Sequence, residues 1–325
     1  MAISGSIDFT LTRDTCIQEA LEQLGVLGEG ESPTASQLSS DAQTLNLMLK
    51  SWQNKEIAQS LIRKFYVFLD DEKRQYNLST TASSSAHSAH NFYVDTLATD
   101  MAEDATSLTV TTGTGAADGD TLLVVLDDGS LGAGDVESGG GTTALVTPAI
   151  EGDDAESGST YFAYTTKVTR PLDILYVNRC QVPSTVGEDT IAAYTSTPCD
   201  ILSRRDYQAL SNKSNEGTPT AVWYDPQWPT ATLHVYPEPK GNGEFLECYG
   251  QFTIDDMDSA SDNFALPSRW YLAVAFNLAF WLTSKYGVSS ETRNDIKEKA
   301  LNSLMDAEFA EAEDYLKFAP NPEGR

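Results

Sequence analysis

The chain has 325 residues, 40% of them apolar, which is enough for about two or three domains with buried cores. It carries 48 acidic and 21 basic residues, a formal net charge of -27. This balance argues against a surface that neutralises nucleic-acid phosphates or anionic lipid, and it suits a very soluble protein or a salty medium.

Two amphipathic helices are predicted near the N-terminus. Residues 12–25 form the first, which Thr12 or Asp14 can cap and Gly25 ends, and residues 36–54 form the second. A short loop joins them, so they make a helical hairpin. The apolar stripes are Ile17, Ala20, Leu21 and Leu24 in the first helix, and Leu38, Ala42, Leu45, Met48, Leu49 and Trp52 in the second.

Strand patterns follow the helices. Residues 61–79 read as two strands around the charged turn DDEKR, and residues 79–91, STTASSSAHSAHN, read as a polar low-complexity linker. Residues 92–166 hold 14 acidic residues and the strand-like stretches SLTVTT, DTLLVVL and YFAYTT, separated by glycine-rich and acidic turns. We predict that this segment is a small all-β domain inserted into a host fold.

The host fold resumes with a strand after the proline in TRPLDILYVNRCQV, at 169–182. A short helix is predicted over 203–212, where Ser203 and Asp206 have the spacing of a capping box. Three further strands are predicted at 221–225, 231–237 and 244–252.

The most apolar stretch is LPSRWYLAVAFNLAFWLTSKYG, residues 266–287. Its centre, from Trp270 to Leu282, is shorter than the roughly 20 apolar residues that cross a bilayer, so it predicts a buried helix between Pro267 and Gly287. Other helices, neighbouring subunits or both must cover it. Asn277, its lone polar residue, should find a hydrogen-bond partner there.

A long helix is predicted from about residue 290, with apolar positions at Ile296, Ala300, Leu301, Leu304, Ala307 and Phe309. Because helices and strands are segregated along the chain, the fold class is α+β: a helical bundle from the N- and C-terminal helices, a β-rich region and the inserted all-β domain. The residues expected to pack the bundle core are Leu45, Trp52, Trp270, Asn277 and Phe280.

The predicted domain organisation has five segments. Residues 1–78 hold the helical hairpin and the first strands, and residues 79–91 are the linker. Residues 92–166 are the inserted β domain. Residues 167–265 are the β-rich part of the core, and residues 266–325 hold the C-terminal helices and their tail. The first residues have neither a basic start nor an apolar run, so we expect no secretory signal peptide there.

The sequence offers little for catalysis or metal binding. Its three histidines are His87 and His90, in the predicted linker, and His234, on a predicted strand. Nucleophile-elbow, phosphate-loop and calcium-loop motifs are absent from the sequence. The scattered cysteines form no Cys-x-x-Cys pair and fit small buried residues in a reducing compartment: Cys16, Cys180, Cys199 and Cys248. We therefore predict no catalytic residue, no metal site and no cofactor.

Four segments taken in order resemble one family, the head-to-tail adaptors of short-tailed bacteriophages, also called packaged-DNA stabilisation or tail accessory factors. They lie within 15–52, 170–177, 203–239 and 266–287. The matching residues are Leu24, Gly25, Val26, Leu45, Asn46, Met48 and Trp52, then Arg170 to Val177, then Asp206, Tyr207, Gly217, Pro219, Tyr236 and Pro237, then Leu266, Pro267, Trp270, Asn277, Leu278, Ala279, Tyr286 and Gly287. Residues 79–166 depart from the shortest family members.

The resemblance implies a structural virion protein at the head-to-tail interface, assembled in the host cytoplasm, that forms a dodecameric ring under the portal protein. Such a ring extends the channel for double-stranded DNA during packaging and ejection, helps to retain packaged DNA and offers a platform to a downstream tail or nozzle protein. It implies no sequence-specific DNA contact, no membrane and no enzymatic activity. The C-terminal segment would reach the portal, with Phe309, Tyr315, Leu316 and Phe318 either as anchors there or as residues that close the helical bundle.

Two other functions stay open. Aromatic residues gather at 221–238 around Trp223, Tyr224, Trp228 and Tyr236, and acidic residues are abundant, as a tail-associated carbohydrate-active or cell-wall-degrading component would require. A hairpin with packed aromatic residues is the more common meaning of such a pattern. Residues 92–166 could also form a host-binding or tail-binding module.

Overall fold

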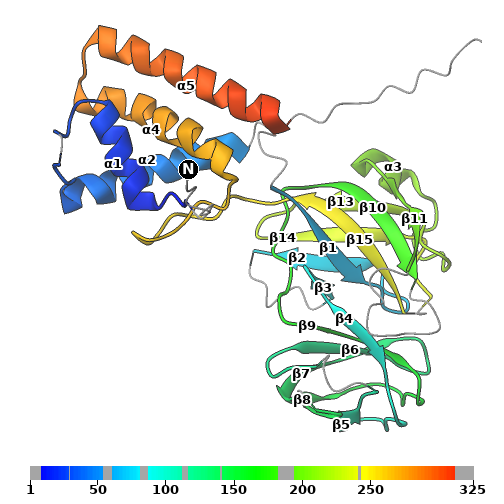
Figure 1. Ribbon diagram of the computed structural model, residues 1–325. Helices are drawn as coiled ribbons and strands as arrows, with labels where there is room; N and C mark the ends of the chain where they lie inside the picture. Colours follow the sequence, from blue (N-terminus) through cyan, green and yellow to red (C-terminus); the bar gives the residue numbers. More distant parts are fainter. Residues whose placement is uncertain are drawn as a thin grey trace, which may run out of the picture. The chain divides into compact units, whose positions relative to one another are not determined.

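The computed structural model describes residues 9–28, 30–53, 61–80, 87–111, 116–139, 141–181, 194–240 and 243–311 (Figure 1). The fold is mixed α+β, with several sheets and a few helices, in agreement with the predicted class. The chain divides into two compact units. Met1–Leu61 with Thr253–Arg325 form one, here the helical unit, and Ile62–Phe252 form the other, here the sheet unit.

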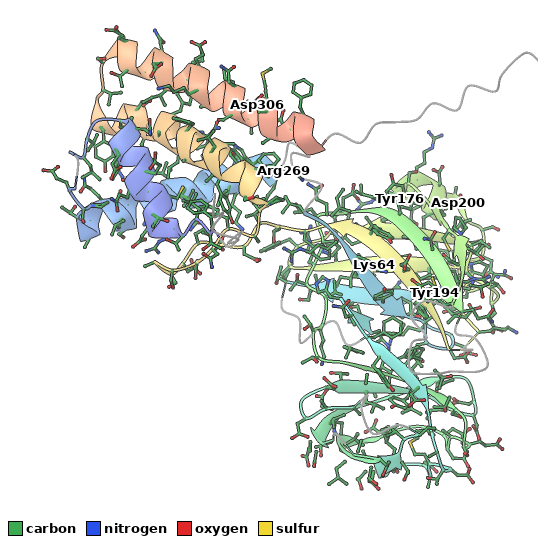
Figure 2. All side chains as sticks on the ribbon, in the orientation of Figure 1. Lys64, Tyr176, Tyr194, Asp200, Arg269 and Asp306 are labelled. Atoms are coloured by element: carbon green, nitrogen blue, oxygen red, sulfur yellow. The ribbon has the colours of Figure 1, made fainter. Side chains whose placement is uncertain are left out.

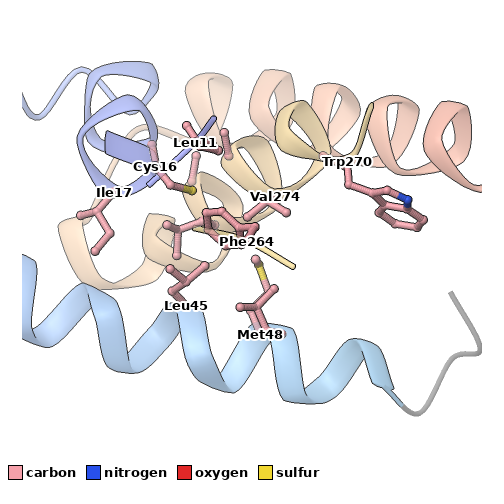
Figure 3. Close-up of a cluster of buried hydrophobic side chains, with 14 of the residues drawn as sticks. Leu11, Cys16, Ile17, Leu45, Met48, Phe264, Trp270 and Val274 are labelled. Carbon is pink, nitrogen blue, oxygen red and sulfur yellow. The ribbon is translucent and has the colours of Figure 1, made fainter. Parts of the chain in front are cut away.

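Helix α4 (Tyr271–Tyr286) is at the centre of the helical unit. It contacts α1 (Arg13–Gln23), α2 (Ala35–Trp52) and α5 (Ser290–Glu311), and the short 3-10 helix η5 (Ser268–Trp270) leads into it. Apolar side chains from these helices meet in one buried cluster, part of which Figure 3 shows. Helices from both ends of the sequence therefore contribute to one core.

Local signals set the ends of these helices. The Thr12 side chain accepts from the Thr15 amide at the start of α1, and Thr34 does the same with Gln37 at the start of α2, both in capping boxes. Gly287 ends α4 in the left-handed conformation, with φ of 62°. The helices α1 and α2 lie within about two residues of their predicted bounds, and α5 begins where the long C-terminal helix was predicted to start.

Three sheets make up the sheet unit as described. The five-stranded sheet has the order β11 (Thr195–Pro198), β10 (Asp173–Gln181), β15 (Glu244–Gln251), β1 (Ile62–Phe68) and β3 (Ser88–Ala89). The four-stranded sheet has the order β12 (Asp200–Ile201), β13 (Ala221–Asp225), β14 (Thr230–Tyr236) and β2 (Gln75–Ser79). The short helix α3 (Arg204–Ala209) contacts β13.

The third sheet belongs to the acidic segment. It has the order β4 (Tyr93–Thr96), β9 (Thr160–Tyr164), β6 (Thr121–Val125), β7 (Leu131–Ser138), β8 (Thr143–Ile150) and β5 (Ala105–Thr109). It has a buried cluster of its own, which includes Leu122, Val124 and Tyr161. A separate cluster joins the five- and four-stranded sheets through residues such as Phe65 and Leu233.

The sheet unit differs from the sequence expectations in several respects. The strands predicted in 61–79 do not form a hairpin, because β1 pairs with β15 and β3 whereas β2 pairs with β14 in another sheet. They also lie in the sheet unit, although the predicted first segment placed them with the N-terminal helices. The predicted linker 79–91 contains β3, whose two residues are buried. Strands β4, β7 and β8 were not predicted individually.

Candidate assembly surfaces of the helical unit

The predicted core residues lie together around α4. Leu45, Trp52 and Trp270 are buried, and Phe280 is half-buried against the same cluster. The rings of Trp52 and Trp270 pack with their centroids 6.0 Å apart, which joins the end of α2 to the start of α4.

Asn277 connects α4 to α5. Its side chain is buried, and Nδ2 donates to the Ala273 carbonyl of its own helix at 2.8 Å and to the Ala300 carbonyl of α5 at 3.1 Å. A buried amide with such partners avoids the cost of an unpaired polar group and favours one alignment of the two helices.

A second polar contact in this unit was not expected from the sequence. Asp41 is fully buried on α2, where it pairs with Lys285 and accepts from the Tyr286 hydroxyl at 2.8 Å. Burial, together with this hydrogen bond, raises the pKa of Tyr286 to about 12. The sequence did contain a sign of this buried contact: the carboxylate of Asp41 is next to Ala42, which belongs to the apolar stripe of the second predicted helix.

The described chain covers only part of α4. Leu272 is 60% exposed, Trp281 is exposed and Phe276 is half-buried. The sequence predicted that other helices, neighbouring subunits or both would cover this helix. Helices α1, α2 and α5 cover only part of its surface.

An apolar stripe runs along the outside of α5. Leu301, Met305 and Phe309 follow one another at intervals of four residues and are all exposed, Phe309 by 78%. Phe309 therefore does not close the core of the helical unit as described. The other predicted portal residues, Tyr315, Leu316 and Phe318, lie outside the described residues.

A groove of about 470 Å³ lies between α1 and the start of α4. Its apolar lining comes from Phe9, Leu11, Tyr271, Leu272 and Ala275, and its polar lining from Thr10, Thr15, Glu19 and Ser268. Phe9 is 72% exposed, with its ring edge-on to Tyr271 at a centroid distance of 6.1 Å. We call this feature the α1–α4 groove.

The groove and the end of α5 are at the same end of the helical unit. Helix α5 contacts η5, whose Ser268 lines the groove. Figure 2 labels Arg269 and Asp306 at this end. Helix α5 is described as far as Glu311, five residues after Asp306.

The histidines of the sheet unit occupy separate surroundings. Burial and the neighbouring Lys73 ammonium, 2.5 Å from its Nε2, lower the pKa of His87 to about 4. His234 stacks on Trp223, and His90 lies against Phe252. Among the residues that the structure describes, no group of three or more histidine, cysteine or acidic side chains is arranged to hold a metal ion.

The four cysteines are buried and free. Burial raises the pKa of each thiol, that of Cys16 to about 12 and that of Cys180 to about 11. Since the thiolate is the reactive form, these side chains behave as small apolar residues.

The aromatic hairpin does not form an open groove in the described structure. Trp223 and Tyr224 are buried, and Tyr236 is half-buried, whereas Trp228 is 77% exposed at the tip between β13 and β14. Arg170 supports this tip, donating to the carbonyls of Pro226 and Gln227 at 2.9 Å each, and its guanidinium lies 5.8 Å from the Trp228 ring centre.

One buried carboxylate on the five-stranded sheet was also missed at the level of sequence. Glu247 of β15 accepts from the Tyr194 hydroxyl and lies 3.4 Å from Lys64 Nζ. Burial, followed by this contact, raises the pKa of Tyr194. Glu247 thus pairs with the Lys64 ammonium and with the Tyr194 hydroxyl. This fits a structural contact that joins β15, β1 and the residue before β11.

None of the helices in the described ranges is long and apolar enough to cross a membrane. The chain matches no protein-family model, and no curated protein matches it either.

Proposed function

We propose that this protein is a non-enzymatic, ring-forming head-to-tail adaptor of a virion. It docks under a portal protein, extends the DNA channel, helps to retain packaged DNA and gives tail proteins a platform. Copies of the chain are its neighbours in the ring, and twelve copies are expected from the family resemblance.

The observation that carries the proposal is the uncovered apolar surface of the helical unit. The α5 stripe and the α1–α4 groove expose large apolar side chains on a chain with 48 acidic residues. A very acidic protein gains nothing in solubility from such side chains, and exposed apolar patches of this kind mark sites of association. This supports a subunit of an assembly more than a monomeric enzyme.

The proposal also assigns roles to the parts of the chain. Helices α1, α2, α4 and α5 act as the bundle that builds the ring, and residues 92–166 act as a domain inserted into the adaptor core. Tyr315, Leu316 and Phe318 anchor the portal contact, and Phe309 lies in the contact between subunits. The net charge of -27 favours the passage of DNA, because fixed phosphate-binding patches would retard it.

Mixing the folded protein with its portal protein and measuring the mass of the product tests this function. The expected product is one portal with a ring of adaptor copies. Persistent monomers beside unoccupied portals would contradict the proposal. A monomer in the absence of the portal is compatible with it, because binding to a partner can stabilise an assembly that does not form alone.

The competing function, a carbohydrate-active or cell-wall-degrading tail component, has less support. Two of the aromatic residues that would line its groove, Trp223 and Tyr224, are buried. Turnover of peptidoglycan that one carboxylate substitution abolishes would establish this function, and folded protein without turnover would remove it.

A further inference from the structure

We infer that the α5 stripe of one copy packs into the α1–α4 groove of the next copy. The inference rests on the proposed ring and adds to it the two surfaces that meet. The occupant of the groove is thus a second copy of this chain, through Leu301, Met305 and Phe309.

The two surfaces complement each other in shape and polarity. The groove is concave and lined mainly by apolar side chains, with Phe9 and Leu272 exposed at its wall. The stripe is a convex row of three exposed apolar side chains, each about one turn of helix from the next. Seating the row in the groove would remove both sets of apolar side chains from water, which favours association.

The two surfaces belong to different faces of the helical unit. On α5, the side that packs inward carries Ile296 and Ala307, whereas Met305 and Phe309 are exposed. The groove is lined by α1, α4 and the segments before them, and it shares no residue with the stripe. One copy can therefore use its stripe and its groove at once.

A contact between unlike surfaces has a geometric consequence. Each added copy offers a free stripe at one side and a free groove at the other, so the contact repeats head to tail and produces a ring when the rotation closes. A symmetric dimer would instead pair the same surface with itself.

Charge supports a second copy as the occupant. Glu19 lines the groove, is exposed and accepts a hydrogen bond from Gln23, without a cationic partner among the described residues. Lys297 stands exposed about one turn before Leu301, and within the described ranges it has no carboxylate partner, unlike Lys299, which pairs with Asp295. Packing the stripe into the groove would place Lys297 near the Glu19 carboxylate. Each of these two charges would then have a partner of opposite sign, although the protein has few cations.

Disulfide trapping tests the pairing directly. Two single variants, Met305→Cys and Leu272→Cys, are mixed and oxidised gently, alone and with the portal protein. We expect a disulfide-linked pair from the mixture and none from either variant by itself. Leu47→Cys replaces Leu272→Cys in the matched control, because Leu47 is an exposed leucine on α2 outside the groove. The native cysteines are buried and should contribute no background.

A charge exchange gives a second, independent measurement. Glu19→Lys should weaken self-association about two- to fivefold, the size of an exposed ion pair, and adding Lys297→Glu should restore it. Glu19→Lys and Lys297→Glu could each weaken self-association while the double variant fails to restore it. That result would overturn the assigned pairing.

The outcomes separate this inference from the proposed function. Portal-bound rings without the Met305–Leu272 link would overturn the inference and leave the adaptor function in place. The link without any portal binding would support the inference and overturn the function. A chain that ends at Glu311 should still form the link. If the shorter chain no longer forms the link, residues 312–325 are the occupant of the groove. The inference that the stripe of a second copy occupies it would then be wrong.

Discussion

The side-chain amide of Asn277 donates to the main-chain carbonyl of Ala300, and this contact ties α4 to α5 in one alignment. Both residues are buried. The contact aligns the apolar stripe on the outside of α5 relative to the α1–α4 groove, because both are built on these two helices and α1.

Replacing Asn277 by alanine should destabilise the helical unit by about 1–2 kcal/mol, through the lost hydrogen bonds and the space left behind. Urea unfolding followed by the helical circular dichroism signal measures this. Asn302→Ala is the matched control, since Asn302 is exposed on α5. Equal unfolding midpoints for the two variants would contradict the role given to Asn277.

Alkaline pH should destabilise the helical unit through Tyr286. Its pKa is about 12 in the folded protein and about 10 when unfolded, so the folded state holds the phenolic proton more tightly. The resulting stability is present below pH 10 and is lost as the pH rises from 10 to 12. Tyr286→Phe should unfold with a shallower dependence on pH in this range.

The matched control for that measurement is Tyr271→Phe, in the same unit but on the groove. Lys285, the other partner of Asp41, is present in both variants. The same pH dependence in Tyr286→Phe and in the control would show that the Asp41–Tyr286 hydrogen bond has no part in it.

Acid should destabilise the sheet unit through His87. Its pKa is about 4 when folded and about 6.5 when unfolded, so the unfolded state binds the extra proton. The stability that this shift gives is present above pH 6.5 and is lost towards pH 4, with a slope of up to about 1.4 kcal/mol per pH unit.

His87→Gln should reduce that slope, and Lys73→Met should reduce it less, because burial lowers the pKa more than the Lys73 charge does. Titration of the histidine ring protons by NMR gives the pKa directly. A His87 pKa at or above the usual value would refute the prediction.

Phe309→Ala should change the stability of the helical unit by less than about 0.5 kcal/mol, because the ring is exposed. The same variant should weaken assembly on the portal. Unfolding in urea and portal co-sedimentation together test this pair of expectations. A large loss of stability would instead assign Phe309 to closing the core.

The helices could be predicted well from the sequence because their signals are local. Thr12 and Gly287 define helix ends, and the apolar spacing identified the buried side of α1 and of α2. Spacing could not reveal that Leu301 lacks cover, because cover depends on which other elements lie opposite. Met305 was not among the predicted apolar positions of this helix.

The sheets were harder to predict because strand pairing is remote in sequence. Strands β1 and β2 are neighbours in the chain, yet their partners β15 and β14 come much later in it, from Glu244 and Thr230 onwards. Strand β7 was hidden by its composition: two of its buried positions are Gly132 and Gly134, which have no apolar side chain to reveal the alternation. A methyl group added at Gly132 would collide with the side chain of Ile150, so the packing of this sheet leaves no room for a larger residue there.

Electron microscopy of the protein mixed with a portal protein shows whether this chain forms a ring at the portal. We predict a ring of adaptor copies coaxial with the portal, with the helical units in contact with one another. Portals that stay bare in the presence of the folded protein would refute the proposed adaptor function.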